Sequence, residues 1–251
     1  MVTCGGPRGK TARLGDVSGP VALVGVGAFL PAMAAFDADL LAITGRRRPR
    51  VVIVPTAAFP DDGPDFERWA ASGVEHFGTL GAEVEVIPVR DRQAADDDAA
   101  AQAIGEADVV YLAGGEPREM LEALAGSAVW SAIVAAHARG ALIAGCSGGA
   151  MALVDRVMAL RGGVLPWPLR WWAGLAVVEG MAVLPRYDRM PEPVAALLAM
   201  QAPRGTAVLG IDEGMAIVGR NGSWQVHGPA RVTVWRGRQR ERLRAGDIFR
   251  V

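Results

Sequence analysis

The sequence predicts an α/β protein with a doubly wound, mostly parallel sheet in three layers and antiparallel C-terminal strands. First, short apolar runs alternate with amphipathic segments from residue 21 to residue 145, which is typical of repeated β-α units. Second, after residue 205 short strand-like runs are separated by glycine turns. Third, 51% of the 251 residues are apolar and 21% are charged, which is enough to fill a core and excludes intrinsic disorder.

The expected elements follow from these patterns in chain order. Residues 51–56 form an unbroken, mostly β-branched run, as in strands buried on both faces. The expected parallel strands are 21–26, 51–56, 83–89, 108–112 and 141–145, and the helices are 31–44, 65–80, 96–104, 118–124, 129–137 and 150–158. No polar linker precedes the later strands. We therefore expect one domain over residues 19–251 after a disordered lead-in, residues 1–18.

The antiparallel part is expected to consist of short strands. The predicted ranges are 207–211, 215–218, 223–226, 231–235 and 247–251. Asn221-Gly222 separates two of them, and this dipeptide is a strong signal for a tight hairpin turn.

Charge and cysteine content exclude several classes of function. The net charge of −1 gives no electrostatic reason to expect nucleic acid or a membrane surface as a partner. The apolar runs fall short of the ~18–20 residues of a membrane span, and no signal peptide pattern is visible, so we expect a cytoplasmic protein. The two cysteines, Cys4 and Cys146, make neither a disulfide framework nor a metal motif. We expect no cofactor and no metal.

The segment Gly145-Cys-Ser147-Gly148-Gly149 has the pattern G-x-S-x-G between an expected strand and an expected helix. In a nucleophile elbow this places the serine on a strained turn, and the following backbone N–H, that of Gly148, stabilises an oxyanion. The alternative is a glycine-rich turn without chemistry.

A second glycine turn, Gly114-Gly115-Glu116, follows the neighbouring expected strand. Backbone amides at the carboxyl edge of adjacent strands can face a ligand there, so Gly115 is a candidate second oxyanion donor. An ordinary turn is an equally good interpretation of this segment alone.

Four ordered segments together resemble peptidase family S51, which includes aspartyl dipeptidase (dipeptidase E) and cyanophycinase and has a class I glutamine amidotransferase-like fold. They are residues 111–117, 144–151, 183–189 and 209–216, and the resemblance extends roughly from Pro20 to Val234. It implies that Ser147 is a nucleophile for hydrolysis of peptide or isopeptide bonds near acidic residues. It also implies a small peptide-like or acidic ligand at Gly114, Glu116, Arg186, Tyr187 and Asp188, and a possible homo-oligomer, since relatives often self-associate.

The sequence departs from the family pattern at the base and at the acid. Arg186 stands where the family has histidine, and arginine remains protonated at any relevant pH. Residues 156–178, where the triad acid is expected, contain no Asp or Glu. His76 and His137 are expected at the opposite edge of the sheet, and no motif brings His227 near Ser147. We therefore predict a serine-hydrolase-type protein with weak activity or none. The alternative is a non-catalytic ligand- or protein-binding protein.

Three further features remain open at this point. Cys146 is interpreted as a buried structural residue rather than a nucleophile. Asp188 is expected to pair with Arg186 or Arg189, with a role as a carboxylate base as the alternative. The aromatic run over residues 166–172 is either a lid or partner surface, or is buried against the body.

Overall fold

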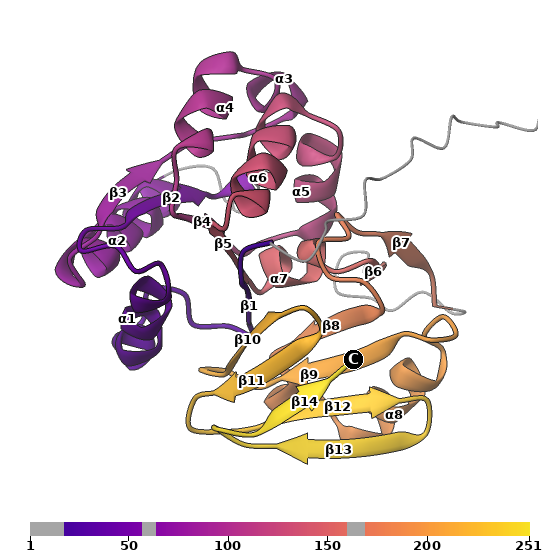
Figure 1. Cartoon of the computed structure of the whole chain (residues 1–251). Helices are drawn as coiled ribbons and strands as arrows, with labels where there is room; N and C mark the ends of the chain where they lie inside the picture. The colour runs from indigo at the N-terminus through magenta and orange to yellow at the C-terminus, as the bar shows by residue number, and fades with distance from the viewer. Residues whose placement is uncertain (1–17, 57–63, 160–168) are drawn as a thin grey trace, which may run out of the picture.

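The computed structural model describes residues 18–56, 64–159 and 169–251 (Figure 1). The expected lead-in therefore lies almost wholly outside the described residues. The predicted fold class is confirmed: an eight-stranded sheet has the order β14-β11-β10-β1-β5-β4-β2-β3, and helices cover both of its faces. A separate four-stranded sheet has the order β13-β12-β9-β8.

Five parallel strands form one half of the large sheet. They are β1 (Val21–Val24), β2 (Arg50–Val54), β3 (Glu83–Val86), β4 (Val109–Leu112) and β5 (Leu142–Cys146). Neighbouring pairs are all parallel, and the four strands other than β3 at the edge are almost completely buried. Continuous Val and Ile runs suit this position because both faces of each strand contact a helix layer.

Helices on both faces make the three layers. On one face, residues of η1 (Pro31–Met33), α1 (Ala34–Ile43) and α2 (Pro64–Thr79) pack against Val51 and Ile53. The opposite layer contains α3 (Arg92–Ala95), α4 (Asp98–Gly105), α5 (Pro117–Leu124), α6 (Ala128–Ala138) and α7 (Gly148–Leu153). The carboxyl ends of β1, β4 and β5 therefore meet at one edge, where ligands bind in doubly wound folds.

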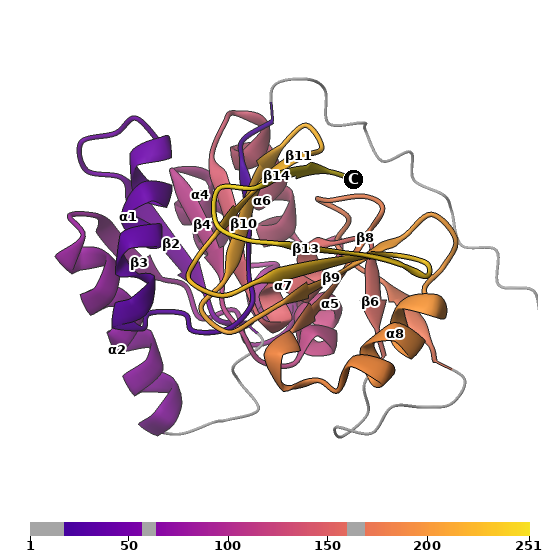
Figure 2. The ribbon, with the colours of Figure 1, turned by 90° about the horizontal axis from the view of Figure 1, so that it is seen from below.

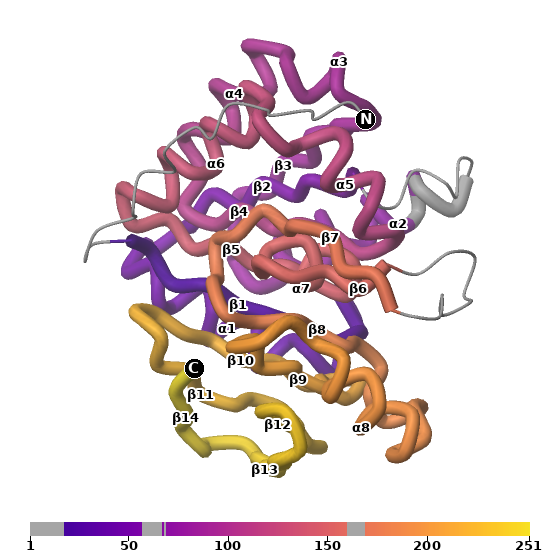
Figure 3. Tube along the Cα trace, turned by 90° about the vertical axis from the view of Figure 1, so that its right-hand side faces the viewer, coloured from indigo at the N-terminus to yellow at the C-terminus, as the bar shows by residue number. Residues whose placement is uncertain are grey.

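The C-terminal strands divide between the two sheets. The hairpin of β10 (Ala216–Arg220) and β11 (Ser223–His227), together with β14 (Ile248–Arg250), extends the large sheet in antiparallel fashion. Asn221 and Gly222 form the predicted hairpin turn, with φ values of 53° and 75°. The smaller sheet combines β8 (Met181–Pro185), β9 (Ala207–Ile211), β12 (Val232–Arg236) and β13 (Gln239–Leu243), and it lies at the opposite end of the molecule from α3 and α4 (Figures 1 and 3).

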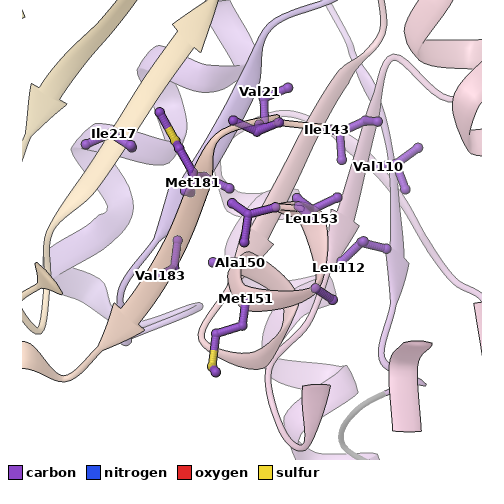
Figure 4. Packing of buried hydrophobic residues seen from close by; sticks show 14 of the residues in the cluster. Val21, Val110, Leu112, Ile143, Ala150, Met151, Leu153, Met181, Val183 and Ile217 are labelled. Carbon is purple, nitrogen blue, oxygen red and sulfur yellow. The ribbon is translucent and has the colours of Figure 1, made fainter. Parts of the chain in front are cut away.

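Alternating side chains of the smaller sheet enter two different cores. Met181 and Val183 of β8 face α7 and the large sheet, where Leu153 and Ile143 belong to the same cluster (Figure 4). The alternate residues Ala182 and Leu184 pack on the other side, toward α8 (Glu192–Met200), which lies beside the smaller sheet in Figure 2. Because successive side chains of a strand point to opposite faces, one face of this sheet packs against the body of the protein, and the other packs against α8 and a 3-10 turn.

One predicted helix is wrong in its length. The helix expected over residues 150–158 ends at Leu153, and β6 (Arg156–Met158) pairs with β7 (Trp171–Ala173) instead. Val154 is extended, with φ −83° and ψ 171°, and the Asp155 carboxylate accepts the backbone N–H of Met181 at 3.0 Å. This tertiary hydrogen bond and the β-branched residues in the segment favour a strand over a further helical turn.

Candidate functional site

Ser147 lies on the turn between β5 and α7 with a backbone that L-residues rarely adopt. Its φ is 52° and its ψ is −114°. The Ser147 N–H donates to the Val24 carbonyl at 3.0 Å, and its own carbonyl accepts the N–H of Met151 at 3.0 Å. Strand β1 on one side and helix α7 on the other therefore fix the strained conformation.

Glycines at this turn allow backbones to meet without side chains between them. A Cβ on Gly148 would overlap the carbonyl oxygen of Gly115, and a Cβ on Gly149 would overlap the carbonyl oxygen of Leu112. A Cβ on Gly114 would lie 3.5 Å from the Ser147 Cβ. The structure thus brings together the sequence-predicted residues from the two glycine turns.

Three polar groups where the two glycine turns meet have no hydrogen-bond partner among the described residues. Within residues 18–56, 64–159 and 169–251, the N–H groups of Gly115 and Gly148 have no acceptor. The Ser147 hydroxyl is half-buried and has no hydrogen-bond partner in the same part of the chain. Free amide donors beside an unpaired hydroxyl can hold an oxyanion or a carboxylate. Among the described residues, no histidine or carboxylate side chain has a hydrogen bond to this hydroxyl.

Arg186 follows β8 at the same end of the structure. Pro185 is in register with Ile211 of β9, and the Gly25 N–H after β1 donates to the Met215 carbonyl at 3.0 Å. Because β1 also holds Ser147, the end of β8 is connected to the serine turn through the ends of β9 and β1. Arg186 is left-handed, with φ 52° and ψ 40°, and exposed. Its guanidinium has no ion pair or hydrogen bond with any described residue.

Tyr187 and Asp188 begin η3 (Tyr187–Arg189) and are both engaged by the smaller sheet. The Tyr187 hydroxyl accepts the indole N–H of Trp235 at 2.9 Å. The Asp188 carboxylate accepts the Glu213 N–H at 2.9 Å, and its ion pair is with Arg189 at 4.0 Å rather than with Arg186. Asp188 therefore anchors the turn after β9.

Glu116, another sequence-predicted binding residue, is the N-cap of α5. Its carboxylate accepts the Arg118 N–H at 3.5 Å. A helix N-terminus favours a carboxylate at this place, so the side chain has a structural partner on its own helix.

A small polar pocket lies next to η3 and was missed by sequence reasoning. Its volume is about 110 Å³, and its lining residues are Tyr187, Asp188, Met190, Glu192, Asp212, Arg231, Thr233 and Arg242. Burial raises the pKa of the Asp212 carboxyl, the Asp188 charge raises it further, and the Arg231 guanidinium opposes both. These residues come from η3 and the residue directly after it, the first residue of α8, strands β12 and β13, and the positions directly after β9 and directly before β12, so only the strand register brings them together.

Each of the three histidines contacts residues other than Ser147. His76 Nε2 lies 2.8 Å from an Asp37 carboxylate oxygen between α1 and α2. His137 contacts the Ala141 carbonyl at 3.1 Å, at the amino end of β5, as the sequence predicts. The His227 ring lies against the Phe36 ring in a tilted arrangement, with 5.4 Å between centroids. None of them has a hydrogen bond to Ser147.

Cys146, directly before Ser147, is buried on the α1–α2 face of the large sheet. Burial raises the pKa of its thiol to about 11. A thiol with this pKa is a poor nucleophile at neutral pH, in agreement with a structural role.

The described part of the aromatic run packs against the body of the protein. The Trp171 indole N–H donates to the Gln201 carbonyl at 3.1 Å, and the Arg118 guanidinium lies 5.7 Å from the Trp172 ring centroid. Residues 166–168 of this run lie outside the described residues, so a lid there stays a prediction.

Within the described ranges, no single helix has the length and hydropathy needed to cross a membrane. Helices α5 and α6 meet both criteria only when taken together, and the pair is bent by 93°. The described ranges also hold no group of three or more His, Cys, Asp or Glu side chains arranged to bind a metal ion.

Comparison with known proteins now decides the family. The family model described as peptidase family S51 matches residues 23–227. The chain belongs to peptidase family S51. Among solved structures, a peptidase from an acI-B1 Actinobacterium is 30% identical, with a TM-score of 0.82 over 94% of this chain and 98% of that one. A Listeria monocytogenes EGD-e protein described as a peptidase E shares the fold at 16% identity, with a TM-score of 0.62 over 85% of this chain and 100% of its own. No curated protein sequence matches the chain.

Proposed function

We propose that this S51 member retains a nucleophile elbow at Ser147 but has lost efficient peptidase activity, and that its crevice binds a small peptide-like or acidic ligand. The observation that carries the proposal is the exposed Arg186 at the family's histidine position, together with a Ser147 hydroxyl that has no partner among the described residues. An arginine at this position donates hydrogen bonds and accepts no proton.

The remaining chemistry is that of binding and charge stabilisation. The Gly115 and Gly148 amides form the proposed oxyanion hole, while residues 156–178 supply no carboxylate to orient a base. Serine hydrolases without their triad partners keep a rate roughly 10³–10⁴-fold above water, from the oxyanion hole and binding alone. Weak ester hydrolysis and very slow peptide hydrolysis are the expected activities.

The acidic character of the ligand follows from Arg186. Its guanidinium is exposed and makes no ion pair with the described residues, at the end of the structure where Ser147 lies. Guanidinium groups bind carboxylates in bidentate fashion, so an acidic side chain or a terminal carboxylate is the complementary group.

Labelling with a fluorophosphonate tests the state of Ser147. The full chain is expected to label slowly, and Ser147→Ala is the control that defines background. Rapid labelling that Ser147→Ala abolishes would show an activated serine and contradict the proposal.

Restoring the histidine tests whether only the base is missing. Arg186→His is expected to increase hydrolysis of a labile ester, whereas Arg186→Gln, which removes the charge without adding a base, is the matched control. An equal rate for both variants would mean that the acid and the geometry around Ser147 are also lost.

A second candidate function is ligand binding without catalysis. The polar pocket beside η3, which is formed without any contribution from Ser147, favours it. Complete absence of labelling, combined with saturable binding of a small ligand, would support this candidate over the first.

A further inference from the structure

The pocket beside η3 has a defined floor on the outer face of the smaller sheet. Thr233 of β12 is in register with Gly210 of β9 and with Arg242 of β13. A Cβ on Gly210 would overlap the ring of Tyr187, so this ring lies directly on the sheet next to Thr233. The turn η3 and the first residue of α8, Glu192, form the walls.

Two deeply buried polar side chains line this pocket. Asp212 is 4% exposed and Thr233 is 3% exposed. The Thr233 hydroxyl makes no hydrogen bond with any described residue and is not among the fully enclosed polar atoms without a partner, so it is open to the pocket. A polar occupant of the pocket can therefore supply the hydrogen-bond partner that the described residues do not.

The charged groups that line the pocket are three carboxylates, of Asp188, Glu192 and Asp212, and two guanidinium groups, of Arg231 and Arg242. Arg242 already donates to Glu192 at 2.9 Å, and Arg240 contacts the same carboxylate. The Asp212 carboxylate has a backbone hydrogen bond with Arg231 and lies 3.9 Å from the Arg231 guanidinium, on a side chain that is mostly exposed. Asp188 contributes a second carboxylate to the lining. Besides Glu192, two carboxylates and a hydroxyl oxygen therefore line this space, and the guanidinium groups nearest to the two carboxylates, those of Arg231 and Arg189, lie at 3.9 and 4.0 Å on mostly exposed side chains.

We propose that this pocket binds the primary ammonium group of a small peptide-like ligand, held by Asp212, Asp188 and the Thr233 hydroxyl. An ammonium group has three N–H donors and no acceptor, which matches three acceptors of this kind. A volume of about 110 Å³ equals that of three to four waters at ~30 Å³ each, so the pocket takes one charged end and not a whole peptide.

This inference deepens the proposed function, because it names the end of the peptide-like ligand that is held beside η3. It rests on the proposed function only for the nature of the rest of the ligand. The ammonium site itself involves none of Ser147, Gly115 and Gly148.

Calorimetric titration of the full chain with glycinamide tests the site, because glycinamide is a cationic amine without a carboxylate. Saturable binding of glycinamide is expected, together with no binding of the neutral N-acetylglycinamide or of acetate. Ser147→Ala is expected to bind glycinamide as the unsubstituted chain does, so labelling results at Ser147 and binding results here are independent. Equal binding of the acetylated probe, preferential binding of acetate, or no glycinamide binding at millimolar concentration would overturn the proposal.

Substitutions assign the binding to this pocket. Thr233→Val removes the hydroxyl with little change in shape and is expected to weaken glycinamide binding about tenfold, as does Asp188→Asn. Glu241→Gln is the control, since Glu241 also lies on the smaller sheet but pairs with Arg236 outside the pocket. Thermal unfolding of each variant checks its folding. A folded Thr233→Val and a folded Asp188→Asn that both bind glycinamide like the unsubstituted chain would refute the assignment.

Discussion

The buried pair of Asp37 and His76 gives the sharpest prediction about stability. The Asp37 and His76 side chains are 2% and 8% exposed, and 2.8 Å separate the carboxylate oxygen from Nε2. The other carboxylate oxygen of Asp37 has no hydrogen-bond partner among the described residues. His76 is thus the partner that compensates the buried carboxylate. Substituting it leaves a carboxylate in an aromatic cluster that contains Phe77 and Tyr111.

We predict that His76→Leu lowers the free energy of unfolding by about 3–5 kcal/mol, the usual cost of removing one member of a buried ion pair. For a chain of this size the midpoint of thermal unfolding should fall by roughly 6–20 °C. Adding Asp37→Asn to His76→Leu should recover part of the loss, because it removes the uncompensated charge. Glu122→Gln is the control: its pair with Arg118 is 2.7 Å long but exposed, and it should change stability by less than about 1 kcal/mol.

The loss in His76→Leu should also depend on pH. Burial raises the pKa of Asp37, and the hydrogen bond and charge of His76 oppose this rise. Without His76 the carboxyl pKa rises further, so the charged form is destabilising at neutral pH and protonation relieves it. The deficit relative to the unsubstituted chain should therefore be largest near neutral pH and shrink as pH falls through that raised pKa. Denaturant unfolding across this range measures it. A His76→Leu chain as stable as the unsubstituted one, or a deficit that grows in acid, would refute the reasoning.

Two other predictions concern the serine turn. Gly148→Ala places a Cβ on the Gly115 carbonyl, so it should lower stability by at least about 1–3 kcal/mol and abolish labelling of Ser147. Gly78→Ala, in open space on α2, should instead raise stability by roughly 0.5–1 kcal/mol, and equal effects of the two in denaturant unfolding would contradict this account. In a Cys4→Ala chain the Cys146 thiol should resist thiol reagents near neutral pH and react faster as pH rises toward about 11; fast neutral reaction of the folded chain would disprove the burial argument.

The sequence predicts the large sheet well because its signals are local. Residues 51–56 can be assigned to a buried strand from their side chains alone, and Asn221-Gly222 specifies a hairpin turn by its backbone preference. The turn at Ser147 is predicted for the same reason, since small residues on both sides of the serine are what the close contact of strand and helix requires.

The smaller sheet carries weaker signals. The edge strand β13, Gln239–Leu243, has four exposed residues, so its sequence resembles a polar loop. Helix α8 has prolines at its start, and the rest of its sequence is almost uniformly apolar, so no helical periodicity is visible. Strand β6 is favoured by the hydrogen bond from the Met181 N–H to the Asp155 carboxylate. The two residues are far apart in the sequence, so no local pattern predicts this contact. The pocket beside η3 depends on the register of β9, β12 and β13, and a single sequence does not give this register.

The turn at Ser147 is assembled entirely from backbone contacts. Val24, Leu112 and Gly115 touch it through carbonyl groups, and no acidic or basic side chain in the described part of the chain has a hydrogen bond to it. The backbone conformation of Ser147 therefore does not depend on the side chains that would transfer a proton. We therefore expect a substitution that adds a base, such as Arg186→His, to leave the strained backbone of Ser147 unchanged, so that groups for proton transfer can be added to this turn one at a time.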